Sequence, residues 1–240
     1  DIHSEKGLCG GSVIVLIYRY DSQLQDILAG IKDKASKAKF ITLITKVSLS
    51  EPPSVNYFTT ENEVPNEFSR NCSSTIDGRG AILYRPFYPQ PRLHIFGGGH
   101  VGQAVAKLAL DLDFDVSIYD DRGDLDISSS ISARICKEMA IMPDFQPNSL
   151  GCDDYILITT RNHHLDLKII SSITNQNPAY IGLMSSKRKW ELIRKDLIQN
   201  GITQDWMDQV NAPVGLNIGS ETVPEIALSI MAEIVSVKNK

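Results

Sequence analysis

The 240-residue chain has little of what marks several common functional classes. It contains no basic tract and no segment in which basic and aromatic residues alternate. Its 24 lysines and arginines against 29 aspartates and glutamates give a formal net charge of −5, which argues against nucleic-acid binding. The longest aliphatic run, residues 13–18, is too short to span a bilayer, and nothing at the start resembles a signal peptide. We therefore expect neither a nucleic acid nor a membrane as a partner.

Cysteine is also scarce, and its arrangement does not suggest a metal site. The chain has no C-x-x-C pair and no histidines at zinc-ligand spacing; its cysteines are Cys9, Cys72, Cys136 and Cys152. We expect reduced thiols, no metal ligands and a cytoplasmic protein. Cys9 lies among glycines in residues 7–11, where its thiol can be a nucleophile, a soft-metal ligand or a small half-buried side chain. The start at Asp1, without methionine, is expected of a fragment or a processed form.

The most informative stretch is a glycine motif that follows directly on a short apolar run. Residues 93–96 lead into Gly97-x-Gly99-x-x-Gly102, and apolar residues then recur at helical spacing: Val101, Val105, Leu108, Ala109 and Leu112. This order is typical of a Rossmann unit, which presents backbone N–H groups and a helix N-terminus to a phosphate. Gly97 allows the tight turn, Gly99 lets a phosphate approach the main chain, and Gly102 lets the helix pack closely on its strand.

An acidic residue stands where a Rossmann unit has its ribose ligand. The apolar run at 116–119 ends in Asp120, 23 positions after Gly97, and the usual offset is roughly 20 residues. We predict that Asp120 binds ribose hydroxyls; the alternative is a solvated acid at a strand end. Arg122 can instead bind an additional phosphate, so the choice between NAD and NADP stays open.

The pattern divides the chain into two halves. The first half shows strands at 13–18, 40–47 and 81–84, and one helix whose apolar face holds Leu24, Ile27, Leu28 and Ile31. Residues 85–91 contain three prolines, which disfavour a helix or a central strand and indicate a linker. We predict a small N-terminal α+β domain over residues 1–88.

The second half alternates strands and helices. Strands are expected at 93–96, 116–119, 133–136, 155–160 and 180–183, and further helices around 165–173, from Ser186 to Gln199 and over 223–237. The continuous apolar run at 155–160 is typical of a central parallel strand. The predicted fold class is therefore α/β, with a Rossmann-like doubly wound parallel sheet over residues 89–240 beside the smaller α+β domain.

Polar residues follow two later strands, at the edge where open α/β sheets bind ligands. After the strand at 155–160, Arg161, His163 and His164 can bind an anion or transfer a proton. The alternative is a helix cap formed by Asn162 or Thr160, and the residues alone leave both interpretations open.

Two further loops combine helix caps with charged side chains. Ser185 or Ser186 can cap the helix after 180–183, and the cations at 187–189 oppose its macrodipole unless an anion binds there. This predicts a second anion site, with Lys187 and Lys189 solvated. In the loop 211–225, Thr222 or Ser220 can cap the last helix, which has Pro224 in its first turn. Glu225 can complete a capping box, whereas Glu221 lies outside the helix and is expected to face a ligand.

Together these motifs resemble the XdhC/CoxI family of xanthine dehydrogenase accessory proteins. The resemblance covers the Rossmann half from end to end and rests on ordered segments: LHIFGGGHVGQ at 93–103, Asp120-x-Arg122, the run from Ile158 to Asp166, YIGLMSSKRK at 180–189 and APVGLNIGSETVPEIA at 212–227. Residues 7–11 look like the family's first-domain motif, but the segment that usually precedes it is absent. The resemblance leaves open whether the N-terminal domain is complete.

The resemblance implies a maturation role rather than turnover, with no catalytic residue. A family member is expected to bind molybdenum cofactor, as molybdopterin or its dinucleotide form, during sulfuration and to insert it into a xanthine dehydrogenase-type molybdenum hydroxylase. A cysteine desulfurase and a second copy of the chain, forming a homodimer, are the other implied partners. The cofactor-binding residues that the resemblance implies are Gly97, Gly99, His100, Val101, Gly102, Asp120, Arg122, Thr160, His163, Ser186, Arg188 and Glu221, with Cys9 from the first domain.

Three positions depart from the family pattern, and two other functions compete. Ser185, Asn217 and Arg161 stand where the family often has glycine, aspartate and histidine, which affects details of the pocket. The main alternative is an NAD(P)-dependent oxidoreductase. However, the Tyr-x-x-x-Lys pair of short-chain enzymes is missing, and His163 or His164 would have to replace it. The second alternative is a dinucleotide-sensing module that regulates a partner.

Overall fold

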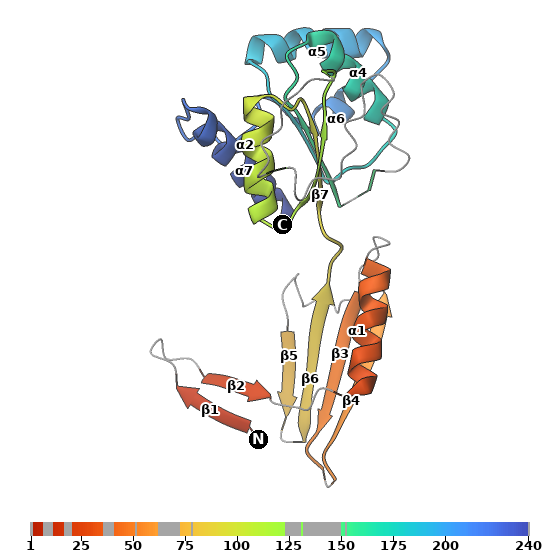
Figure 1. Cartoon of the computed structure of the whole chain (residues 1–240). Helices are drawn as coiled ribbons and strands as arrows, with labels where there is room; N and C mark the ends of the chain where they lie inside the picture. The colour runs from red at the N-terminus through yellow and green to blue at the C-terminus, as the bar shows by residue number, and fades with distance from the viewer. Residues whose placement is uncertain are drawn as a thin grey trace. The chain divides into compact units, whose positions relative to one another are not determined.

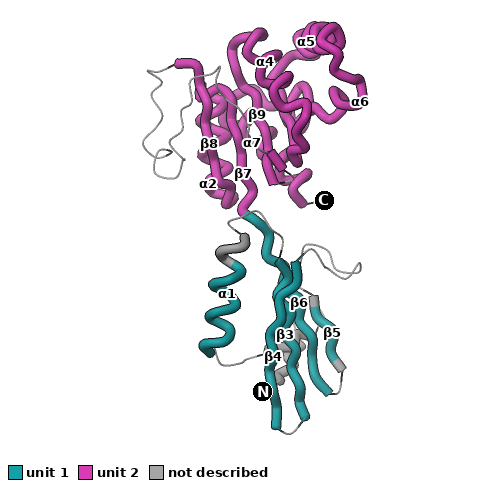
Figure 2. Tube along the Cα trace, turned by 90° about the vertical axis from the view of Figure 1, so that its right-hand side faces the viewer, with its two compact units in different colours: residues 1–89 teal, residues 90–240 magenta. Residues whose placement is uncertain are grey.

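The computed structural model describes residues 2–6, 12–16, 21–35, 41–50, 52–61, 73–77, 79–122, 131, 150–151 and 153–239. The chain divides into two compact units, Asp1–Pro89 and Gln90–Lys240 (Figure 2). Each unit is built on its own sheet.

The first unit is built on a four-stranded antiparallel sheet. Its strand order is β4 (Ser54–Glu61), β3 (Ile41–Ser48), β6 (Gly80–Phe87) and β5 (Ser73–Asp77) (Figure 1). Helix α1 (Ser22–Ala35) packs on the sheet through Leu24 and Ile31, which share a small apolar core with residues of β3 and β4. Strands β1 (Ile2–Lys6) and β2 (Ser12–Leu16) pair antiparallel as a separate two-stranded sheet.

The sequence analysis predicted some elements of this unit and not others. The predicted helix and the strands β2, β3 and β6 are present, but β1, β4 and β5 were not predicted. The assignment of residues 85–87 to a linker is wrong, because β6 continues through Pro86 to Phe87 and pairs with β3. Proline is tolerated there since, among the described residues, β5 pairs with β6 only over Gly80–Tyr84, which leaves β3 as the one described strand paired with Pro86.

The second unit is a parallel five-stranded sheet, and the predicted Rossmann-like α/β fold is confirmed. The strand order is β11 (Val210–Asn211), β10 (Tyr180–Leu183), β9 (Asp154–Ile158), β7 (Arg92–Phe96) and β8 (Asp115–Tyr119). Leu93 and Ile95 face a core shared with α2 (His100–Asp111) and α7 (Val223–Lys238). Phe96 faces the opposite core, shared with α4 (His163–Ile173) and α5 (Lys187–Gln199).

This arrangement places a switch point between β7 and β9. The chain leaves β7 into α2 on one face and leaves β9 into α4 on the other face (Figure 1). The two loops therefore diverge at the carboxyl edge, where open α/β sheets bind their ligands.

Some details of the second unit differ from the prediction. The central strand ends at Ile158, so Thr159 and Thr160 belong to the following loop. Leu112, assigned to the apolar helix face, is the C-cap of α2 and is exposed. Helix α6 (Gln204–Met207) and β11 were not predicted, and the strand expected at 133–136 lies outside the described residues.

Candidate functional site

In the glycine loop after β7, the three motif glycines differ in how much space is left for a side chain. Gly97 has a φ of +109°, and an added Cβ would lie 2.6 Å from the carbonyl oxygen of Thr159. At Gly102 an added Cβ would lie 2.0 Å from the carbonyl oxygen of Gly97. At Gly99 an added Cβ would meet nothing within 4 Å. The turn and packing roles of Gly97 and Gly102 are confirmed, and the ligand role of Gly99 stays a prediction.

The N-terminus of α2 opens directly behind this loop. Gly99 is its N-cap, and the first intrahelical hydrogen bond runs from the Gln103 N–H to the Gly99 carbonyl at 2.9 Å. Helix geometry leaves the N–H groups of the first turn, including those of His100 and Val101, pointing out of the helix end. These donors and the helix dipole favour an anion at this position.

Asp120, just beyond β8, is tied to the same loop. Its carboxylate accepts hydrogen bonds from the Gly98 N–H at 2.7 Å, the Arg122 N–H at 3.0 Å, and Nε and a terminal nitrogen of Arg122, both at 2.8 Å. The side chain is buried, with 3% exposed. Burial alone would raise the pKa of Asp120, but the hydrogen bonds from Arg122 and Gly98 outweigh it and hold that pKa at about 2.

A cavity of about 120 Å³ lies between the ends of β7, β8 and β9. It brings together five of the residues implied by the resemblance: Gly97, Gly99, Asp120, Arg122 and Thr160. Asp121, Thr159 and Arg161 complete its lining and were not assigned to the cofactor. The sequence analysis placed Thr159 inside the strand expected at 155–160 and so missed it, whereas Arg161 was already a candidate anion ligand.

Hydrogen bonds attach the end of β9 to the glycine loop. The Thr159 hydroxyl donates to the carbonyl oxygen of Gly97 at 2.8 Å, and its N–H donates to that of Phe96 at 2.7 Å. The Thr160 hydroxyl lies 2.5 Å from Oδ1 of Asp166 in α4. Both hydroxyls are therefore hydrogen-bonded within the protein.

The other implied binding residues do not line this cavity. Nε2 of His163 is 3.1 Å from Oδ2 of Asp196 in α5, and Asn162 caps α4 by accepting from the His164 N–H at 2.9 Å. Ser186 caps α5, and Arg188 is exposed. Glu221 is also exposed, and its N–H donates to Glu225, which forms the capping box with Thr222. Cys9 lies outside the described residues.

The expectation that Lys189 is solvated is wrong. Its ammonium lies 2.6 Å from Oδ2 of Asp166, whose side chain is 0% exposed. A buried carboxylate requires such a partner, because an unpaired charge away from water is strongly unfavourable. Asp166 thus joins Thr160, at the end of β9, to the first turn of α5.

A third buried carboxylate lies at the opposite, amino edge of the sheet. Asp154, the first residue of β9, accepts two hydrogen bonds of 2.7 Å from Arg92 and lies 2.9 Å from Nε2 of His94. Burial alone would raise its pKa, but the hydrogen bonds from His94 and Arg92 outweigh burial and hold it at about 2. This cluster is far along the strands from the glycine loop and ties β7 to β9.

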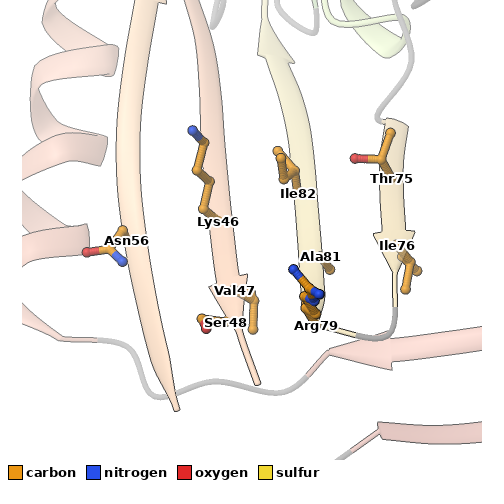
Figure 3. A pocket seen from close by; sticks show the side chains of 10 residues that line it. Lys46, Val47, Ser48, Asn56, Thr75, Ile76, Arg79, Ala81 and Ile82 are labelled. Atoms are coloured by element: carbon orange, nitrogen blue, oxygen red, sulfur yellow. The ribbon is translucent and has the colours of Figure 1, made fainter. Parts of the chain in front are cut away.

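The first unit has a larger cavity of about 440 Å³ on its sheet (Figure 3). Its lining side chains come from four adjacent strands and the turn before β6, and include Lys46, Asn56, Thr75, Arg79 and Ile82. The sequence analysis assigned no function to these residues. Among the described residues as a whole, no cluster of three or more histidine, cysteine or acidic side chains could hold a metal. Within the same residues, no helix is both long and apolar enough to span a membrane.

Comparison with known proteins identifies relatives of this fold. The chain is 34% identical over 153 residues to the uncharacterized protein YqeB of Escherichia coli K12, covering 62% of this chain and 28% of that protein. It is 26% identical over 246 aligned positions to a probable xanthine dehydrogenase subunit of Bacillus subtilis 168, covering 97% and 71%. It is 28% identical over 152 residues to the molybdenum cofactor insertion chaperone PaoD of Escherichia coli K12, covering 63% and 42%.

The matched region thus spans less than two thirds of YqeB and of PaoD. Among solved structures, the chain is similar to the crystal structure of a xanthine dehydrogenase from Bacillus halodurans, with a TM-score of 0.65 and 23% identity. That match covers 91% of this chain and 65% of the other, and it supports the fold alone. The model of the XdhC Rossmann domain matches residues 93–234, more than half of the sequence, and the chain therefore belongs to the XdhC family.

Proposed function

We propose that the protein is a maturation factor that holds molybdenum cofactor and passes it to a xanthine dehydrogenase-type molybdenum hydroxylase. Two relatives support this role by their names, a molybdenum cofactor insertion chaperone and a probable xanthine dehydrogenase subunit. Assistance in sulfuration by a cysteine desulfurase, a homodimeric state and a cytoplasmic location belong to the same proposal.

The cavity at the glycine loop is the observation that carries the proposal. The open position at Gly99 leaves room for an anion at the N-terminus of α2, whose first-turn N–H groups are donors, and Arg122 and Arg161 bring positive charge to the cavity lining. The cavity measures about 120 Å³, whereas pockets for whole drug-sized ligands measure roughly 300–1,000 Å³. The residues therefore fit the phosphate end of the pterin cofactor, and the remainder of the molecule would extend beyond the cavity.

The chemistry of the lining residues supports binding rather than turnover. Asp120 is held ionised and hydrogen-bonded, and the two arginines carry a permanent charge, so these three groups are unsuited to proton transfer near neutral pH. The oxidoreductase alternative needs His163 or His164 near the ligand. His163 instead contacts Asp196 of α5 and does not line the cavity.

The decisive experiment measures cofactor retention by the full chain. We expect the purified protein, incubated with molybdenum cofactor and separated by gel filtration, to retain molybdenum and to activate the cofactor-free hydroxylase. Gly99→Val should lower the affinity at least tenfold without destabilising the fold, because its side chain projects into open space where a phosphate would lie.

Gly151→Val is the matched control, since a Cβ there also meets nothing within 4 Å but lies outside the cavity lining. It should retain cofactor like the wild type. No retention by the wild-type protein would refute the maturation role. Equal retention by Gly99→Val would show that the ligand binds elsewhere.

A further inference from the structure

Two aspartate–arginine pairs line the cavity at the glycine loop, and they differ in strength. Asp120 is 3% exposed and bidentate with Arg122, and two backbone N–H groups donate to it as well. Asp121 lies 3.8 Å from Arg161, too far for a hydrogen bond, and the two side chains are 32% and 69% exposed. Exposed ion pairs stabilise a fold very little, because water screens the charges and two flexible side chains must be ordered. The first pair is therefore fixed, and the second separates easily.

The loops that carry this second pair are nevertheless anchored. Asp121 directly follows Asp120 and its four hydrogen bonds. Arg161 directly follows two threonines whose hydroxyls are bonded to the glycine loop and to α4. Among the described residues, Asp121 and Arg161 have no ionic partner other than each other. The structure thus fixes the backbone at both positions and leaves the long side chain of Arg161 able to turn.

The charges of the cavity lining cancel while both pairs are intact, since it contains two aspartates and two arginines. An anion at the N-terminus of α2 meets the N–H groups of the first turn, but the carboxylate of Asp121 repels it. Of the two arginines, Arg161 is the one that can leave its carboxylate at little cost. Turning from Asp121 to the anion gives Arg161 a charge-assisted hydrogen bond that its present contact lacks.

We propose that Asp121 and Arg161 form an exchangeable ion pair that controls the binding and release of an anion at this cavity. Arg161 contacts Asp121 in the absence of the anion and contacts the phosphate end of the ligand in its presence. Asp121 competes for the guanidinium, which weakens binding and favours release. The inference rests on the proposed function and deepens it, because a factor that delivers its cargo must also let it go.

Titration with a small probe tests the exchange. The phosphate monoester of 6-hydroxymethylpterin is titrated into the full chain and followed by its fluorescence, with 6-hydroxymethylpterin as the matched probe without phosphate. Arg161→Gln should weaken monoester binding at least fivefold, and Asp121→Asn should strengthen it at least fivefold. Neither variant should change binding of the unphosphorylated probe by more than twofold. Equal binding of both probes by the wild-type chain, or unchanged monoester affinity in either variant, would overturn the proposal.

The double variant separates exchange from simple repulsion of the anion by Asp121. If Asp121 acts by holding Arg161, the gain in affinity from Asp121→Asn should be at least threefold larger in the wild-type background than in the Arg161→Gln background. Equal gains in the two backgrounds would show that Asp121 acts on the anion by itself, and the exchange would be refuted.

Two substitutions of the same kind elsewhere in the second unit are the controls. Arg194→Gln removes an arginine that lies 3.5 Å from Asp208, and Asp111→Asn removes an exposed aspartate at the end of α2. Neither Arg194 nor Asp111 lines the cavity, so monoester affinity should stay within twofold of the wild-type value. Changes as large as those of the cavity variants would assign the effect to net charge and overturn the proposal.

The outcomes also distinguish this inference from the proposed function. Asp121→Asn should transfer molybdenum cofactor to the hydroxylase at least threefold more slowly than the wild type, and unchanged transfer would refute its part in release. If the wild-type chain retains and delivers the cofactor but neither variant alters monoester binding, the exchange is refuted and the maturation role stands. If the exchange is seen with the monoester but the wild-type chain retains no cofactor, the maturation role is refuted and the exchange stands.

Discussion

At the scale of single residues, the three glycines of the motif are under different steric constraints. Gly97 adopts a positive φ that other residues rarely tolerate, and Gly102 allows the backbone of α2 to approach that of the loop. Gly99 has neither constraint, and its hydrogen atom faces open space. Two of these glycines are therefore required by the fold, and the third is available for ligand binding.

This difference predicts opposite outcomes for two equivalent substitutions. Gly102→Ala should destabilise the second unit by about 1–3 kcal/mol or more, because the new methyl group would overlap the carbonyl of Gly97 and the backbone must shift. Gly99→Ala should change stability by no more than about 0.5 kcal/mol. Urea unfolding followed by tryptophan fluorescence reports this unit alone, since both tryptophans, Trp190 and Trp206, lie in it. Equal stability of the two variants would contradict the assignment.

At the scale of secondary-structure elements, buried ionic contacts hold strands and helices in register. Asp154 links β9 to β7 at the amino edge of the sheet, and Asp166 of α4 contacts Thr160 beyond β9 and Lys189 of α5. The second set positions the loop that lines the cavity. The residues implied on α4 and α5, such as His163 and Ser186, thus serve helix packing and capping in this structure.

Removing the cation from this contact should be costly. Lys189→Met keeps a similar side-chain length but leaves Asp166 buried without its cation, and we expect a loss of about 1–3 kcal/mol in the free energy of unfolding. The additional change Asp166→Asn should restore part of that loss, because it removes the uncompensated charge. Lys187→Met is the control on the same helix: Lys187 is exposed, so little change is expected. A similar loss of stability in Lys189→Met and Lys187→Met would rule out the ion pair as the cause.

At the scale of the whole molecule, the two units differ in how well their secondary structure could be predicted from the sequence. The second unit has long apolar periodicities and buried parallel strands, and nearly all of its described elements were predicted. In the first unit, β4 and β5 carry mostly polar residues with several exposed side chains, so neither a continuous run nor a clear alternation marks them. Their place in the sheet depends on pairing with β3 and β6, their neighbours in the sequence, and β3 and β6 in turn pair with each other across a long stretch of chain.

The stability of the second unit should depend on pH through two of its carboxylates. Asp120 and Asp154 each have a folded pKa of about 2 against an ordinary value of 3.8. Because the folded pKa values are lowered, their contribution is fully present above about pH 5 and is lost as the pH falls toward 2. Each contributes about 2 kcal/mol.

Tryptophan-monitored urea unfolding between pH 7 and pH 2 measures this loss. The double variant Asp120→Asn and Asp154→Asn should be less stable at pH 7 and should lack this part of the pH dependence. If the wild-type protein and the double variant show the same slope, other groups are responsible for the acid sensitivity.

The sequence by itself determined the Rossmann unit, the glycine loop, and the proximity of Asp120 and Arg122 to that loop. These features follow from local spacing: strands end in turns, turns open helices, and the carboxyl ends of parallel strands meet at one edge. The resemblance to the XdhC family also rested on such ordered local segments.

Only the tertiary structure decided how these side chains are used. Spacing placed Asp120 near a ligand, but whether its oxygens face a ribose or Arg122 depends on side-chain geometry that no periodicity encodes. The same holds for Lys189, which looked solvated and instead contacts a buried carboxylate. Hydrogen bonds and ion pairs depend on the positions of side-chain atoms to within a few tenths of an ångström, and only the folded chain sets those positions.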